Sequence, residues 1–267
     1  MQNTLISLIL FILISIVPSV GAVTLTFAYE DKPQPPYYMG NTNQLRQIKP
    51  GVAVEMLQLL TQGIDDLQIK FVRMPWKRAL YSLKNNRVDG VFNASYKKER
   101  LAFGWYPTTN LKHDGPIDTS RRITNISYSL YKLKTSSVNW QGQWQDLNGQ
   151  LVGAPLGYSI VSDLQKQGIQ VEESDSTLSN LRMLTTKRLK LVALQTVTAD
   201  SALNEKENKH RYNAIEKLTP ALISKPYYLM LSNRLMIDHP VLAQRIWDEI
   251  KLIREAHMPD LLKAYQE

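Results

Sequence analysis

The sequence predicts an α/β fold of two lobes, and three observations lead to that prediction. From residue 23 onward, short segments with strand patterns alternate with segments of helical periodicity. Strands that alternate with helices imply parallel sheets with crossover connections. The order helix, basic turn, apolar strand and small polar residues occurs twice, over 76–95 and 178–196. Two copies are too few for a solenoid and indicate two lobes built on one plan.

Each predicted element follows from a local pattern. Alternating or wholly apolar runs predict strands, whereas apolar residues three and four positions apart predict helices. Residues 30–43 are rich in proline and aromatic residues and are predicted to form a loop. The predicted strands and extended segments cover 24–29, 67–71, 88–92, 127–133, 151–154, 169–171, 189–194 and 227–232. The predicted helices cover 50–62, 76–83, 160–166, 177–186, a long segment from Pro240 and a final short segment over 258–265.

The N-terminus has the features of a secretory signal. Residues 5–17 form an apolar run of 13 residues, and proline, glycine and other small residues follow it. That run is short for a membrane span, which needs about 20 apolar residues. We therefore expect residues 1–22 to be a signal peptide cleaved after Ala22, with an uncleaved anchor as the alternative. Export without any cysteine fits the periplasm of a Gram-negative bacterium.

Composition narrows the possible functions. The absence of cysteine excludes a disulfide scaffold, a lipid-modified cysteine and thiol chemistry. The net charge is +8, but the 32 basic residues are scattered, so an exported chain of this kind is not expected to bind nucleic acid. The histidines have neither metal nor triad spacing, so we expect no metal and no cofactor. They are His113, His210, His239 and His257.

Local chemistry favours anion binding over catalysis. Gly157-Tyr158-Ser159 follows a predicted strand and opens a predicted helix, but Val161 stands where a nucleophile elbow needs its second glycine, so no enzyme is expected. The backbone N–H groups and the helix dipole at such a turn favour a carboxylate or phosphate. Arg100, just past a predicted strand, could grip a carboxylate with two parallel hydrogen bonds. Trp76, at a helix start, could stack on a ligand or only anchor its helix.

Five short motifs occur in an order and spacing that suggest one family. They are PGVAVEML at 50–57, PWKRAL at 75–80, VDGVF at 88–92, KER at 98–100 and LNGQLVG at 147–153. From residue 23 to the C-terminus the chain resembles type II periplasmic solute-binding proteins of the amino-acid-binding kind (solute-binding protein family 3), the substrate-binding components of ABC transporters.

The resemblance implies two Rossmann-like lobes joined by a hinge of two crossing segments, near 125–128 and 223–228. Lobe 1 would comprise residues 23–126 with 227–267, and lobe 2 residues 127–226. The resemblance further implies a monomer that closes over a small-molecule ligand. The closed form would then dock on an inner-membrane partner, either a transporter permease or a sensor.

The resemblance also assigns site roles where positions match. Trp76 falls at the aromatic residue that stacks on the ligand. Asn93 and Ser95 fall at polar residues that hydrogen-bond it. Arg100 falls at the arginine that binds the ligand's carboxylate, and Ser159 at a hydroxyl residue whose backbone N–H meets the same group.

Two departures from the family pattern change the expected ligand. Gln195 replaces the acid that usually pairs with the ligand's amino group, and Lys190 stands where aspartate is common. A neutral amide cannot balance a buried ammonium. The expected ligand is therefore a carboxylate without an amine, or a solute whose amine meets Glu30 or Asp31. Tyr37, in the loop that follows, is a further candidate for the lining of the site.

The sequence leaves three functions open. The leading hypothesis is capture of a small polar, carboxylate-bearing, amino-acid-like solute for delivery to an ABC-type importer. A ligand-sensing partner of a membrane signalling protein would use the same fold. A periplasmic dehydratase-like enzyme would need a general acid in the cleft, and Gln195 removes the most obvious candidate.

Overall fold

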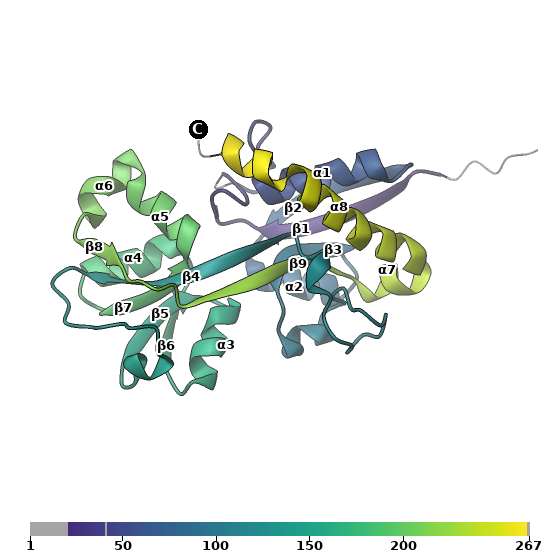
Figure 1. Cartoon of the computed structure of the whole chain (residues 1–267). Coiled ribbons are helices and arrows are strands. Elements are labelled where there is room, and N and C mark those ends of the chain that lie inside the picture. Colours follow the sequence, from purple (N-terminus) through teal and green to yellow (C-terminus); the bar gives the residue numbers. More distant parts are fainter. Residues whose placement is uncertain (1–20, 41, 266–267) are drawn as a thin grey trace, which may run out of the picture.

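The computed structural model describes residues 21–40 and 42–265 (Figure 1). The predicted signal peptide lies outside the described residues, apart from its last two positions. Within the described ranges, none of the helices has the length and apolar character needed to cross a membrane.

The strands join into a single mixed sheet with the order β2-β1-β3-β9-β4-β7-β5-β6, and β8 pairs with β4 at its side. β1 runs parallel to β2 and β3, and β5 runs parallel to β6 and β7. The predicted parallel units with crossover helices are therefore confirmed. The strands are β1 (Val23–Glu30), β2 (Leu67–Met74), β3 (Gly90–Ser95), β4 (Thr124–Leu133), β5 (Leu151–Pro155), β6 (Gln170–Ser174), β7 (Leu191–Gln195), β8 (Ile215–Lys217) and β9 (Ile223–Leu231).

Two lobes share this sheet, and the long strands β4 and β9 run between them (Figure 1). One lobe contains β1, β2 and β3, and the other contains β5, β6 and β7. β4 and β9 pair antiparallel where they cross, with Thr124 opposite Tyr227 and Tyr128 opposite Ile223. The two Rossmann-like lobes expected from the sequence are thus present, and two strands connect them.

Eight α-helices among the described residues cover the two faces of the sheet. Successive residues of β1 point to opposite faces, so Phe27 and Tyr29 share a core cluster with α1 and α8 while Ala28 packs with α2. The helices are α1 (Val52–Gly63), α2 (Trp76–Lys84), α3 (Ser159–Lys166), α4 (Thr177–Thr185), α5 (Thr196–Asn204), α6 (Lys206–Tyr212), α7 (Asn233–Asp238) and α8 (Pro240–Ala264).

The predicted break before a final short helix is wrong, because α8 continues through Pro259 to Ala264. A proline inside a helix removes one backbone hydrogen bond, here the bond to the carbonyl of Glu255. Met258 and Leu261 nevertheless pack against the main core cluster. Burial of this apolar stripe offsets the lost hydrogen bond, so the helix persists beyond the proline.

Candidate functional site

A small cavity lies between the two lobes, at the ends of strands from both. Its volume is about 10 Å³, which is room for roughly one water molecule. A solute of amino-acid size can enter only when the lobes move apart, so the structure has the lobes drawn together over the site. The lining residues are Glu30, Gln34, Tyr38, Trp76, Asn93, Ser95, Arg100, Tyr158, Ser159, Gln195 and Tyr227.

The strand ends explain why polar residues gather at this point. Glu30 is the last residue of β1, Ser95 of β3 and Gln195 of β7. The chain between β5 and α3 places Tyr158 and Ser159 at the start of a helix. Ligands of open α/β sheets bind beyond the carboxyl ends of strands, and here the two lobes direct such ends at one another.

Arg100 lies in a short 3-10 helix, η1 (Lys98–Ala102), and is only 4% exposed. Its Nη1 donates to the backbone oxygen of Ser95 at 2.7 Å, and its Nη2 donates across the lobes to the backbone oxygen of Gly157 at 3.1 Å. Its Cζ lies 5.1 Å from the ring centroid of Trp76, so the guanidinium stacks on the indole. All of its hydrogen bonds within the described chain go to Ser95 and Gly157, and none goes to a carboxylate.

The start of α3 faces Arg100 from the second lobe. Ser95 Oγ donates to Ser159 Oγ at 2.7 Å, which joins the lobes beside the guanidinium. The helix dipole adds partial positive charge at this end of α3. The backbone N–H groups that the sequence suggested for anion binding are already engaged at two positions of this turn: that of Gly157 donates to Glu173 at 2.7 Å, and that of Tyr158 donates to the backbone oxygen of Pro155 at 3.1 Å. Gly157 thus serves the site through its carbonyl oxygen.

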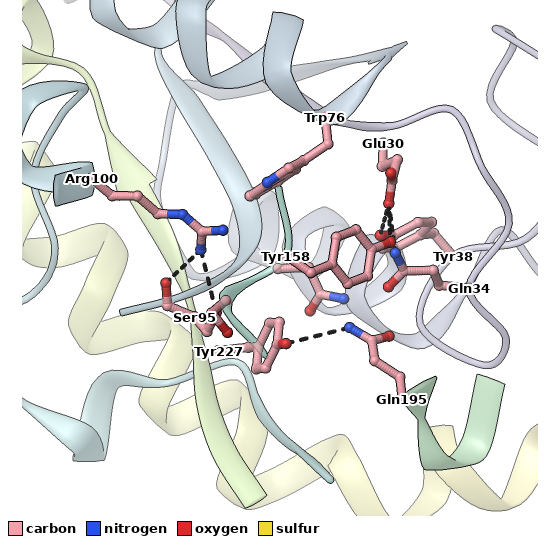
Figure 2. Close-up of a pocket in the computed structure, with 11 residues that line it drawn as sticks. Glu30, Gln34, Tyr38, Trp76, Ser95, Arg100, Tyr158, Gln195 and Tyr227 are labelled. Atoms are coloured by element: carbon pink, nitrogen blue, oxygen red, sulfur yellow. Dashed lines mark hydrogen bonds between the residues drawn. The ribbon is translucent and has the colours of Figure 1, made fainter. Parts of the chain in front are cut away.

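Glu30 carries a buried carboxyl group, 6% exposed, at another side of the cavity. Gln34 Nε2 donates to its Oε2 at 2.6 Å and the hydroxyl of Tyr38 donates at 3.3 Å. The hydroxyl of Tyr158 donates a short hydrogen bond to the same oxygen from the second lobe. In Figure 2, Glu30, Gln34 and Tyr38 lie on one side of Trp76, and Arg100 lies on the other.

Burial raises the pKa of Glu30 from the ordinary 4.5 to about 7, although the three donors act in the opposite direction. Burial also raises the pKa of Tyr38 and Tyr158 well above 10, so both remain phenols that can donate. Near neutral pH the Glu30 carboxyl therefore exchanges between a neutral and an ionised form, and a nearby cation would favour the ionised form.

Asn93 combines backbone strain with unmet hydrogen-bonding capacity. Its φ is +60°, in the left-handed region, at a register irregularity between β3 and β9. The side chain is 6% exposed, yet neither its Oδ1 nor its Nδ2 has a partner among the described residues. The indole Nε1 of Trp76, which lines the same cavity, is also buried without a partner among the described residues. Native structures rarely leave such groups unpaired unless they have a functional role.

Gln195 contacts the tyrosines of the two crossing strands. Its Nε2 lies 3.5 Å from the hydroxyl of Tyr128 and 3.4 Å from that of Tyr227, and these two hydroxyls are 2.7 Å apart. Its Oε1 accepts from Thr198 at 3.5 Å. These distances lie near the upper limit for hydrogen bonds, so the contacts are weak ones, and the residue lines the cavity.

The structure brings eight of the ten sequence-predicted site residues to the cavity wall: Glu30, Trp76, Asn93, Ser95, Arg100, Tyr158, Ser159 and Gln195. Gly157 is adjacent through its carbonyl. Tyr37 instead lines a separate groove beside α5 and the end of α8. Asp31 does not line the cavity either.

Sequence reasoning missed Gln34, Tyr38 and Tyr227. Gln34 and Tyr38 belong to an irregular loop without periodicity, whereas Tyr227 could have been found because it lies in an expected crossing segment. In the described part of the chain, no cluster of histidine, aspartate and glutamate could hold a metal ion.

Comparison with solved structures identifies the fold. The GluR0 ligand-binding core in complex with L-glutamate superposes with a TM-score of 0.70 at 13% identity, over 92% of this chain and 99% of that chain. Holo ArgBP from T. maritima gives a TM-score of 0.64 at 16% identity, over 91% and 96%. The chain has the periplasmic binding-protein fold. A histidine kinase sensor domain with similarity to periplasmic binding proteins also matches, with a TM-score of 0.68 at 14% identity over 90% and 94%.

Sequence comparison adds nothing to this fold assignment. No protein-family model matches the sequence, and no curated protein matches it. Both lobes contribute to the wall of the cavity between them, which makes it the candidate ligand site.

Proposed function

We propose that this protein is a periplasmic solute-binding protein that closes over one small zwitterionic solute and delivers it to an ABC-type importer. Arg100 holds the solute's carboxylate, and Glu30 holds its cationic amine. Closure of the two lobes about β4 and β9 buries the solute. We place the lobe boundaries at residues 23–126 with 227–267 for lobe 1 and 127–226 for lobe 2.

One observation carries this proposal: two buried, oppositely charged side chains line one cavity and neither has a charged partner in the described chain. Arg100 bonds only to Ser95 and Gly157, and Glu30 only to neutral donors. Burying an unpaired charge costs several kcal/mol. A solute with a carboxylate and an ammonium would compensate both charges at once.

The groups near each charge support the same assignment. On the Arg100 side, the Ser159 hydroxyl and the positive end of α3 complement a carboxylate. On the Glu30 side, three neutral donors hold a carboxylate oxygen in place without cancelling its charge. Asn93 and Trp76 offer unpaired donors and an acceptor to the middle of the solute.

The expected signal peptide supports export, and the ligand-binding proteins that share the fold support a binding role. Holo ArgBP and the GluR0 core, which is complexed with L-glutamate, are both ligand-binding structures. Their likeness supports the binding of a small ligand by this chain. The inner-membrane partner of the closed form is part of the proposal.

A sensory role is the second candidate, because a histidine kinase sensor domain has a similar fold. Both roles use the same closure and differ only in the membrane partner. Capture of a permease or of a kinase from solubilised inner membranes by the solute-loaded protein would distinguish them.

Catalysis is not part of the proposal. A dehydratase-like reaction needs a proton donor, and the only buried carboxyl group in the cavity wall of the described chain is that of Glu30. Its three neighbours all donate hydrogen bonds to it, which lowers its pKa, although burial is the larger cause and raises that pKa to about 7. Because all three neighbours are donors, they complement the carboxylate form, which is the form that accepts a cation.

The test is a binding screen of the protein from Val23 onward with matched solutes at pH 8. The panel contains ω-amino carboxylates of increasing length, basic and neutral α-amino acids, alkyl carboxylates and diamines. Thermal shift gives the first ranking, and calorimetry gives the affinity. We expect solutes with both charges to bind more tightly than matched solutes that lack either one.

Two variants assign the two ends of the solute. Arg100→Met should abolish discrimination in favour of a carboxylate, and Glu30→Gln should abolish discrimination in favour of an amine. Lys98→Met, at an exposed neighbour of Arg100, is the matched control and should bind as the wild type does. Equal affinity of the wild type for a zwitterion and for its uncharged-amine analogue would refute the role of Glu30.

A further inference from the structure

Arg73, near the end of β2, is a buried cation outside the cavity wall. Its side chain is 6% exposed, and all four of its hydrogen bonds within the described chain go to backbone oxygens. Nε donates to Glu30 at 3.3 Å and Nη1 to Met39 at 3.0 Å. Nη2 donates to Asp31 at 3.1 Å and to Gly40 at 2.8 Å.

These four acceptors lie at the two ends of one loop. Two belong to the residues that end β1 and begin the loop, and two lie nine residues further along the chain. The guanidinium therefore closes the segment 30–40 into a ring. A planar fork of five donors can satisfy four carbonyls at once, whereas a lysine ammonium has three donors and a different geometry.

The closed segment contains three residues of the cavity wall: Glu30, Gln34 and Tyr38. Within it, Gln34 and Tyr38 are joined by a backbone bond of 2.9 Å, and both side chains donate to Glu30. A flexible loop would lose these alignments, because ordering each free residue costs about 1–2 kcal/mol.

The aromatic rings of the core fix the position of the Arg73 guanidinium. Its Cζ lies 5.2 Å from the ring centroid of Tyr29, which stacks on Phe92 at 4.8 Å. In front, Gly40 has φ +82°, and a Cβ there would lie 3.2 Å from Arg73 Nη1. The close approach of loop and guanidinium thus depends on a glycine at position 40.

We propose that Arg73 is a positioning residue of the solute site: by closing the 30–40 loop it holds Glu30, Gln34 and Tyr38 in the arrangement that receives the solute's cationic end. That this part of the site receives a cationic group rests on the proposed function. The closure of the loop around Glu30 does not, and it can be tested without any solute.

The experiment is a carbon-13 NMR titration of glutamate carboxyl groups in the solute-free protein, with the signal of Glu30 assigned by its absence in Glu30→Gln. Burial is the main cause of the raised pKa of Glu30, about 7, so this value reports whether the loop still excludes water. In Arg73→Lys we expect a midpoint at least one pH unit lower, toward the ordinary 4.5.

Arg254→Lys is the matched control. Arg254 also donates to two backbone oxygens, those of Ser120 at 2.5 Å and Arg122 at 2.7 Å, but lies on α8 away from the cavity. This variant should lose thermal stability and keep the Glu30 midpoint of the wild type. An Arg73→Lys midpoint equal to that of the wild type, with stability lowered as in the control, would reduce Arg73 to a general structural role and overturn the proposal.

Gly40→Ala provides a second measurement, decisive if Arg73→Lys does not fold. The added methyl group forces loop and guanidinium apart while the positive charge stays in place. We expect the Glu30 midpoint to fall in the same direction by a smaller amount, and an unchanged midpoint would count against the proposal. Because no solute is present, failure here is distinct from failure of the binding screen.

Discussion

Replacement of Glu30 by glutamine should remove the pH dependence that this residue gives to the free energy of unfolding. Glutamine keeps the size of the side chain and an oxygen that accepts hydrogen bonds, but it cannot ionise. The pKa of Glu30 is about 7 in the folded protein and 4.5 ordinarily, and the difference corresponds to about 3 kcal/mol. Because the folded pKa is the higher one, this stabilising contribution is complete below about pH 4.5 and is lost as the pH rises through 7.

The assay is urea unfolding of the wild type and of Glu30→Gln from pH 4.5 to 8.5 without solute. At each pH, the free energy of unfolding of the wild type is subtracted from that of the variant. We expect the variant to gain about 3 kcal/mol relative to the wild type across this range, or roughly 6–12 °C in melting temperature. Glu207→Gln changes an exposed glutamate and should give a flat difference. A flat difference for Glu30→Gln as well would show that the carboxyl group is not desolvated, and the reasoning about its charge would fail.

Three further substitutions separate folding from binding. Asn93→Gly should raise the unfolding free energy by about 1 kcal/mol, since glycine accepts φ +60° without strain, and should weaken solute binding in calorimetry because the unpaired amide is gone; lower stability would show that the amide serves the fold. Arg100→Ala should weaken binding by roughly 2–5 kcal/mol because it leaves a buried carboxylate unpaired, and unchanged affinity would remove Arg100 from the site. Gln195→Asp should shift preference toward amine-bearing solutes in the same screen, and no gain for amino acids would refute our interpretation of position 195.

Much of the fold could be predicted because the chain shows its periodicity plainly. Phe27, Ala28 and Tyr29 alternate between two cores, as a strand buried on both faces requires. The short elements α5, α6, α7 and β8 were not predicted, and the last helix was divided at Met258. Local sequence patterns carry little information where tertiary packing determines the secondary structure. The helix α8, for example, continues through Pro259 because its apolar residues pack against the core.

Some residues of the site could likewise be predicted from the sequence, and others could not. Residues at strand ends, such as Glu30 and Ser95, could be placed because parallel strands direct their ends to one edge. Tyr37 and Tyr38 could not be told apart from the sequence. The turn closed between Gln34 and Tyr38 gives adjacent side chains different directions, and only Tyr38 reaches the cavity. The cross-lobe bond between Tyr158 and Glu30 joins residues far apart in the chain, and no local pattern encodes it.

The position of α8 bears on the order in which this chain can mature. Its side chains Ile246, Trp247 and Ile250 complete a core that β1 and α1 begin at the other end of the sequence. The half of the molecule built around β1 therefore cannot complete its core until α8 has left the ribosome, whereas the half built around β5 is continuous and can assemble earlier. In the export that we propose, this arrangement would leave the first-made segment without its packing partner until α8 has been made.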